Sequence, residues 1–333
     1  MQGILPIIKN NSGCDYHRVI NPMNYLGMDT RTIPKISTEE MLADTKVLFF
    51  NRTPNNPIQK VLDYKRKYGF KIVIDTDDIW ELNVRHPMYK VWTEKRMGEE
   101  IHDWIKVADA VTVTTARLAD KVRPINKNVH VIPNGLPFDS GQFTANKTES
   151  DLCRFIYTGG ESHVWDVQVL RDVMKKTNVL SNSSFILAGY NPSKAHNWSK
   201  MESVFRQTKN YERRAGQKLE VYMSVYENAD VCIIPLESNI FTPFKSNIKF
   251  LEAGCKYMPV ICSNVPPYSD EQDKSKVTYA GNVREWFEAL KYHHDNPNFV
   301  KEKGQELGEY VRKNYDLRKM NVYRTQLFKH LMS

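Results

Sequence analysis

The residues best placed to do chemistry lie between two apolar strands in the second half of the chain. Lys245, Ser246 and Asn247 follow a strand expected at 231–235, and they open a helix that precedes another strand at 259–263. A strand, loop, helix and strand in this order form the βαβ unit of a parallel sheet. The loop would lie at the carboxyl ends of the strands, where open α/β sheets bind ligands. Free N–H groups at the helix start and the charge of Lys245 therefore predict an anion site.

A second candidate phosphate site follows the strand expected at 154–157. Gly159 and Gly160 would let the backbone approach a phosphate closely, and His163 could reach the same anion. The spacing is not GxGxxG, so a dinucleotide fingerprint is absent. The alternative interpretation is a plain tight turn with Asp166 in the first turn of the next helix.

A cluster of carboxylates ends the strand expected at 71–75. Asp75, Asp77 and Asp78 stand within four consecutive residues. Such a cluster can bind a metal, act as a base or cap a helix. We favour a catalytic or acceptor-facing role for Asp77 or Asp78, with helix capping as the equal alternative. Metal binding ranks last, and we expect no metal site.

The elements that must position these residues alternate between strand and helix. Strands are expected at 4–8, 46–50, 71–75, 110–113, 129–132, 154–157, 184–188, 219–222, 231–235 and 259–263. Helices are expected at 16–26 (unless Pro22 cuts it short), 58–68, 97–107, 116–122, 165–177, 199–214, 246–254, 283–296, 298–315 and 317–331. This alternation predicts an α/β fold with parallel sheets and helices on both faces. The polar stretch 137–151 is the expected linker, which leaves residues 1–136 and 152–315 as two domains and 316–333 as a C-terminal helix.

Composition limits the class of protein. The chain has 333 residues with 41% hydrophobic content, and its five cysteines are scattered without a CxxC pair. That cysteine pattern favours a reducing cytosol over disulfides or zinc. No apolar run approaches the roughly 20 residues that span a bilayer, and the N-terminus lacks the pattern of a signal peptide. We therefore expect a cytoplasmic protein without a transmembrane segment. Its net charge of +8 favours polyanionic partners.

The passage from 231 to 263 resembles the donor-nucleotide signature of GT-B glycosyltransferases of the family-4 type. The glycine turn at 158–166 and the Pro133-Asn134-Gly135 turn are similar to the same family, and the resemblance covers most of residues 110–270. It implies two Rossmann-like domains that face across a cleft, with the C-terminal helix packing back on the first. It also implies a nucleotide-sugar donor, transfer with retention, and no metal or other cofactor.

The resemblance implies roles for individual residues of the donor site. The diphosphate would lie at the helix start beside Lys245, and Glu252 would hold the ribose. Gly189 ends another strand of the donor domain. Tyr222 lies where the family usually places its base-binding loop, although core packing is an equal alternative. Gly13 occupies the place of the family's glycine loop, which touches donor phosphates.

The acceptor side is expected to draw on the segment after Gly13 and on the end of the next strand. We predict acceptor contacts for Tyr16, Arg18 and Arg52, and a catalytic role for His17. All four belong to the first domain, which would face the donor across the cleft.

The favoured acceptor is a hydroxymethylated base in bacteriophage DNA, and the compartment would then be the bacterial host cytoplasm. The basic charge supports this choice because phosphate contacts dominate affinity for DNA, and the target base would be flipped into the cleft. A bacterial glycan or lipid-linked sugar is the alternative acceptor. An inactive nucleotide-sugar- or nucleic-acid-binding protein also stays open, because Phe244 stands where the family has its first glutamate. A GT-B epimerase is a further alternative.

Overall fold

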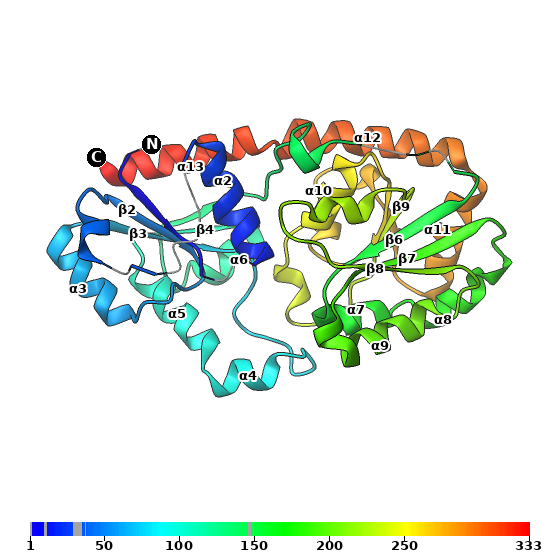
Figure 1. Ribbon diagram of the computed structural model, residues 1–333, viewed down its shortest axis with the longest axis horizontal. Coiled ribbons are helices and arrows are strands. Elements are labelled where there is room, and N and C mark those ends of the chain that lie inside the picture. Colours follow the sequence, from blue (N-terminus) through cyan, green and yellow to red (C-terminus); the bar gives the residue numbers. More distant parts are fainter. Residues whose placement is uncertain (1, 10–11, 29–34, 37, 146–147, 149) are drawn as a thin grey trace.

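Two parallel sheets form the centre of the molecule (Figure 1). The computed structural model describes residues 1–333 except 1, 10–11, 29–34, 37, 146–147 and 149. The first sheet has the order β1-β2-β3-β4-β5 and the second β11-β10-β9-β6-β7-β8. The strands are β1 (Ile4–Ile7), β2 (Val47–Asn51), β3 (Lys71–Thr76), β4 (Ala110–Val113), β5 (Val129–Val131), β6 (Cys153–Thr158), β7 (Ser183–Tyr190), β8 (Tyr211–Ala215), β9 (Val231–Ile234), β10 (Val260–Ser263) and β11 (Thr278–Ala280). The α/β fold expected from the alternating pattern is confirmed.

Helices cover both sheets. Those of the first half are α1 (Gly13–Asp15), the π-helical turn η1 (Tyr16–Ile20), α2 (Asn21–Tyr25), α3 (Ile58–Tyr68), α4 (Tyr89–Glu94), α5 (Met97–Val107) and α6 (Ala116–Val122). Those of the second half are α7 (Val164–Gln168), α8 (Arg171–Met174), α9 (Ala195–Phe205), α10 (Ile248–Cys255), α11 (Val283–Asp295), α12 (Pro297–Tyr315) and α13 (Leu317–Met332). Of the helices in the described residues, none is both long enough and apolar enough to cross a bilayer.

The pattern of burial explains why these segments form a layered structure. All five residues of β2 are buried, as expected for a central strand covered by helices on both faces. In α5 the buried residues Ile101, Trp104 and Ile105 recur at helical spacing and form one apolar face. The Trp104 ring lies 5.2 Å from that of Phe50, which ties this helix to the sheet.

The C-terminal helix returns to the first half of the molecule. In Figure 1 α12 runs along the second sheet and α13 continues over the first. The ring centroids of Phe328 and Phe49 are 5.3 Å apart, and Asn321 Nδ2 donates to the carbonyl of Pro22 at 2.9 Å. A bridge between Leu136 and Asp316 holds the two crossover segments together. The expected packing of this helix on the first domain is confirmed.

Several element predictions were wrong. The helix expected at 199–214 ends at Phe205. Residues 206–210 form a turn, and the edge strand β8 follows, whose three consecutive charged residues were read as part of the helix. The strand expected at 219–222 does not form: residues 219–221 are a turn, and Tyr222 begins the 3-10 turn η7 (Tyr222–Tyr226). The helix expected at 165–177 is broken into α7, α8 and a 3-10 turn. Pro22 does not end its helix, because it falls in the first turn of α2, where proline is tolerated.

Residues 141–143 of the segment between the two sheets are held by packing and hydrogen bonds. Phe143 is buried in a 3-10 turn, and Gln142 donates to the hydroxyl of Tyr16 at 2.6 Å and to the carbonyl of Leu219 at 2.8 Å. Residues 146–147 and 149 of the predicted linker lie outside the described part of the chain.

Candidate active site

A cavity of about 710 Å³ lies where the carboxyl ends of both sheets meet. The first half contributes Gly13, Cys14, His17, Arg18, Asp77, Asp78 and Asn134. The second half contributes Thr158, Gly159, Gly160, Glu161, His163, Ala188, Gly189, Asn191, Gly216, Gln217, Leu219, Tyr222, Val225, Tyr226, Leu236, Lys245, Ser246, Ile248, Lys249, Glu252 and Tyr268. We refer to this cavity as the cleft. It brings together most of the residues that the sequence singles out.

The start of α10 supplies positive charge to the cleft. Lys245 and Lys249 both line it, and burial together with the charge of Lys245 lowers the pKa of Lys249. Lys249 was missed by the sequence reasoning. The signal was present, because Lys249 precedes Glu252 by three residues and so shares its face of the helix. The predicted helix start is corrected, because α10 begins at Ile248, three residues after Lys245. Lys249 and Glu252 lie on one side of α10, and Lys245 precedes it at the same cleft wall.

Ser246 and Asn247, the two residues after Lys245, have different roles. Ser246 Oγ accepts a hydrogen bond from Asn134 Nδ2 at 2.9 Å, which joins α10 to the end of the first sheet. The side chain of Asn247 donates to Glu271 at 3.2 Å, and Asn247 is not among the residues that line the cleft. The predicted donor contact by the Asn247 side chain is therefore corrected to a structural one.

The absence of a side chain has different consequences at the glycines that follow β6 and end β7. Gly189 has φ +108°, and a Cβ there would lie 2.4 Å from the carbonyl oxygen of Gly159. The two strand ends thus pack backbone against backbone. A Cβ on Gly160 or Gly13 would meet no atom within 4 Å, so both glycines leave open space at the cleft.

His163 is held as a neutral imidazole. Its Nδ1 lies 2.7 Å from Asp166 Oδ2. Burial, reinforced by the charges of Lys249 and Lys245, lowers the pKa of His163 to about 3. His163 was predicted from the sequence to neutralise a bound anion. A neutral imidazole has no positive charge with which to do so. Lys245 and Lys249 carry the positive charge instead.

A polar network crosses the floor of the cleft from one domain to the other. The hydroxyl of Tyr222 lies 3.2 Å from His17 Nε2, which is 3.7 Å from Glu252 Oε1. Tyr226 donates to Glu252 Oε2 at 2.7 Å. Burial raises the pKa of Glu252 and lowers that of His17 to about 4. His17 is therefore neutral near pH 7, and its Nδ1 is buried without a hydrogen-bond partner among the described atoms.

Tyr16 lies behind this network. Only 9% of it is exposed, it packs in the core of the second half, and it is not among the residues that line the cleft. Its ring meets that of Tyr222 edge-on, with centroids 5.9 Å apart. The predicted acceptor contact by Tyr16 is corrected to a packing role between the domains.

The three aspartates at the end of β3 fall into two groups with different roles. Asp77 and Asp78 line the cleft and share Arg52, whose Nη2 lies 3.0 Å from Asp77 Oδ1 and 3.2 Å from Asp78 Oδ2. Burial acts to raise the pKa of Asp77, but the charge of Arg52 prevails and lowers it to about 2; burial raises the pKa of Asp78. The helix-capping alternative is wrong, because the next helix begins only at Tyr89.

Arg18 belongs to the other part of the cluster. Its side chain and that of Asp75 are fully buried and joined by two hydrogen bonds of 2.8 Å. The remaining donors of Arg18 reach Asn134 Oδ1 at 3.0 Å and the carbonyl of Ile132 at 2.8 Å. Because its guanidinium makes these hydrogen bonds within the protein, Arg18 stabilises the end of the first sheet. The predicted acceptor contact by Arg18 is therefore corrected to a structural role. Arg52 is not among the residues that line the cleft, and it pairs with the two aspartates that do.

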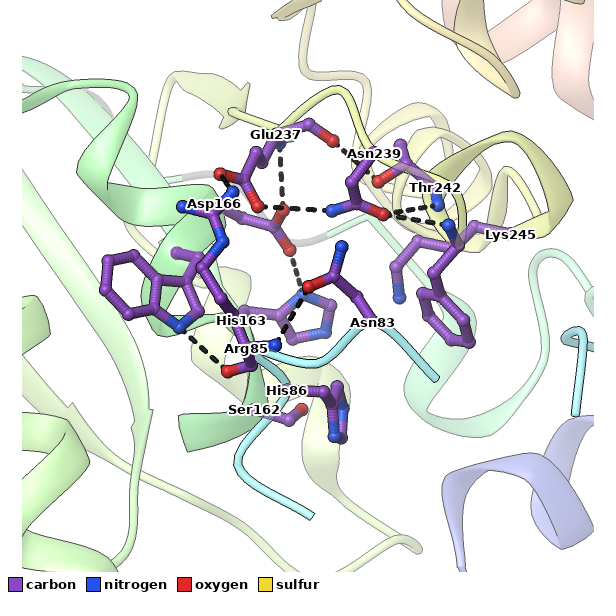
Figure 2. A pocket seen from close by; sticks show the side chains of 12 residues that line it. Asn83, Arg85, His86, Ser162, His163, Asp166, Glu237, Asn239, Thr242 and Lys245 are labelled. Atoms are coloured by element: carbon purple, nitrogen blue, oxygen red, sulfur yellow. Dashed lines mark hydrogen bonds and ion pairs between the residues drawn. The ribbon is translucent and has the colours of Figure 1, made fainter. Parts of the chain in front are cut away.

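A smaller cavity of about 40 Å³ opens beside the cleft (Figure 2). The loop after β3 contributes Asn83, Arg85 and His86, and the second half contributes Ser162, His163, Trp165, Asp166, Glu237, Asn239, Phe241, Thr242 and Lys245. We call it the side cavity. Within the part of the chain that the structure describes, no three His, Cys, Asp or Glu side chains are grouped so as to hold a metal ion.

Comparison with known proteins identifies the fold. No protein-family model matches the chain, and no curated protein matches its sequence. Among solved structures, HepE of Anabaena in complex with UDP-glucose superposes with a TM-score of 0.72 at 10% identity, over 99% of this chain and 100% of that one. A sucrose-phosphate synthase of Thermosynechococcus elongatus gives 0.64 at 14% identity, over 91% and 81%.

TarM of S. aureus is a third similar structure. It gives a TM-score of 0.60 at 13% identity and matches 86% of this chain. The chain spans only 55% of the length of TarM. These neighbours are GT-B glycosyltransferases, and the chain shares their fold of two parallel sheets flanked by helices.

Proposed function

We propose that the protein is a glycosyltransferase that takes a sugar from a nucleotide-sugar donor. The observation that carries the proposal is the wall of the cleft in the second half. There Gly160 leaves room for a phosphate, while Lys245 and Lys249 supply charge at the start of α10. Glu252 stands one turn further along, held in place by Tyr226. Two neighbours of the same fold, HepE and a TarM mutant, were solved with UDP or UDP-glucose.

The arrangement suits departure of a nucleoside diphosphate. Two cations near the diphosphate would stabilise the negative charge that develops on the leaving group. Glu252 would accept hydrogen bonds from the ribose hydroxyls, since a carboxylate offers two acceptor oxygens. Donor binding is thus assigned to the second domain.

The acceptor is assigned to the opposite wall. Asp77, ionised beside Arg52, would accept a hydrogen bond from the incoming hydroxyl, and the neighbouring Asp78 would contact the acceptor as well. We propose transfer with retention, the departing phosphate oxygen taking the proton of the acceptor. Comparing the anomeric configuration of donor and product by NMR tests this point, and an inverted product would contradict it.

For the acceptor itself we propose a hydroxymethylated base in duplex DNA. The net charge of +8 supports it, because cationic surfaces attract the DNA backbone. A glycan or lipid-linked sugar is the competing acceptor.

Nucleoside mass spectrometry tests the proposed function. Hydroxymethylated duplex DNA is incubated with the protein and a panel of nucleotide sugars, with unmodified DNA and Glu252→Gln protein as controls. A sugar-sized mass gain on the modified base in the wild-type reaction alone is the expected result. Donor consumption without that gain would replace DNA by a glycan or lipid acceptor. Neither binding nor consumption of any donor would refute the glycosyltransferase.

A further inference from the structure

The side cavity shares two residues with the cleft. His163 and Lys245 line both spaces, so the cleft and the side cavity adjoin at these two side chains. In Figure 2 the His163 ring lies amid the residues that line the side cavity, and a dashed line joins it to Asp166. A ligand group that lies beside Lys245 is therefore also close to His163.

The tautomer of His163 follows from its partners. Asp166 Oδ1 accepts the backbone N–H of Glu237 at 2.9 Å, and Asp166 Oδ2 faces His163 Nδ1 at 2.7 Å. A carboxylate only accepts hydrogen bonds, so the proton of the neutral ring sits on Nδ1. The Nε2 atom is left with a free lone pair, which makes it a hydrogen-bond acceptor.

The other groups around the side cavity suit hydroxyls. The backbone N–H of Met88 donates to His86 Nδ1 at 3.1 Å, so a neutral His86 carries its proton on Nε2 as a donor. The ring of Phe241 lies near His86, with centroids 6.1 Å apart, and adds an apolar face. Ser162 contributes a hydroxyl. The lining also holds charged groups, among them Arg85 and Glu237, which pair with each other. The uncharged donors and acceptors beside an apolar face match the mixed polar and apolar edge of a sugar.

Size decides how much of a sugar can enter. A water-sized group needs roughly 10–15 Å³ of such space, so the side cavity of about 40 Å³ admits about three heavy atoms. A whole hexose ring does not fit there, whereas the cleft of about 710 Å³ holds a nucleotide sugar with room to spare. One edge or exocyclic arm of the ring can reach into the side cavity while the ring stays in the cleft.

We propose that the side cavity receives a hydroxyl-bearing edge of the transferred sugar, and that Nε2 of His163 accepts a hydrogen bond from that hydroxyl. The inference rests on the proposed function and makes His163 a specificity-determining residue for the sugar. Asp166 is a positioning residue, since it acts on the sugar only by fixing the tautomer of His163.

Substitution Asp166→Asn offers a direct test. The amide oxygen of the new side chain must stay on the N–H of Glu237, because that group only donates. The amide nitrogen then faces Nδ1 of His163 and donates to it, which moves the ring proton to Nε2. The substitution therefore turns the sugar-facing atom of His163 from an acceptor into a donor. Asp172→Asn, at an exposed position on α8, is the matched control.

The measurement is calorimetric binding of UDP-glucose and of its monodeoxyfluoro analogues, one for each hydroxyl of the sugar. Fluorine cannot donate a hydrogen bond, so one analogue should bind wild-type and Asp172→Asn protein at least ~10-fold more weakly than UDP-glucose. That penalty should disappear in Asp166→Asn. NMR of nitrogen-labelled histidine reports in the same samples whether the fold is kept and which ring nitrogen holds the proton.

The outcomes separate this inference from the proposed function. If no analogue is penalised more in wild-type than in Asp166→Asn protein, or if the ring proton of His163 is found on Nε2 in the wild type, the inference is overturned. Binding of UDP alone tests the donor site independently of the sugar. Tight binding of UDP with no effect of fluorination would leave the donor site in place and remove only the role of His163.

Discussion

Replacing Arg18 by methionine distinguishes a structural role from an acceptor contact. The structure places Arg18 and Asp75 together with both side chains fully buried, joined by two hydrogen bonds of 2.8 Å. Methionine keeps much of the length and the apolar packing of the arginine stem. The change therefore removes mainly the charge and its hydrogen bonds, leaving the carboxylate of Asp75 buried without its counter-ion.

The expected loss of stability follows from that geometry. Removing one partner of a buried ion pair costs about 3–5 kcal/mol, because the remaining charge is uncompensated. Two features reduce the cost. Thr112 Oγ1 and Asn51 Nδ2 still donate to Asp75. Arg324, whose pKa is lowered to about 9 by burial and by the charge of Arg18, is also relieved of repulsion. We therefore expect a loss of about 3 kcal/mol in the free energy of unfolding.

Urea denaturation, followed by circular dichroism, measures this loss. Arg117→Met is the matched control, because Arg117 pairs with Asp270 at the surface with about 45% of its side chain exposed. That pair should contribute about 1 kcal/mol or less. The double variant Arg18→Met/Asp75→Asn should lose less than the single one, since the buried carboxylate that has lost its arginine is removed as well. A loss below about 1 kcal/mol for Arg18→Met, combined with weaker acceptor binding, would refute the structural role.

Further predictions concern the donor site and pH. Lys249→Met should weaken UDP binding by about 10-fold or more in calorimetry, since a charge-assisted contact is lost; unchanged affinity would remove Lys249 from the site. Gly160→Ala should also weaken UDP binding but keep the fold, whereas Gly189→Ala should destabilise the fold by about 2 kcal/mol or more, because its φ is +108° and its Cβ would clash. Equal stability of the two variants in thermal melts would contradict this reasoning. The pKa of His17 is about 4 in the folded chain against 6.5 normally, so between these values the unfolded state binds the extra proton. Stability should therefore fall as the pH drops from 6.5 to 4, by at most about 3 kcal/mol, and less in His17→Gln; identical pH profiles would contradict it.

The layered fold could be predicted from the sequence because its strands are short apolar runs separated by periodic helices. The prediction failed where that signal is weak. The helix α4 has no buried residue, so no apolar periodicity marks it. The strand β8 lies at a sheet edge, and its charged residues resemble a solvated helix face.

The donor side of the cleft was more predictable than the acceptor side. Lys245 lies just before α10 and Glu252 lies on it, so one short segment places both at the same wall without knowledge of any other segment. The role of Arg18 depends instead on Asp75, which is 57 residues away and meets it only in the folded sheet. Likewise, only the fold shows that burial and two lysines keep His163 neutral. Long-range charge partners are what local sequence patterns leave undetermined.

The central claim is that the cleft binds and uses a nucleotide sugar. Its most direct test is release of nucleoside diphosphate from a panel of nucleotide sugars, with hydroxymethylated DNA present, compared between wild-type and Glu252→Gln protein. The account predicts that the wild type consumes at least one donor and that Glu252→Gln loses most of this activity, since Glu252 lies in the cleft beside His17. If no donor is bound or consumed, or if both proteins consume it equally, the assignment of the cleft as the donor site is contradicted.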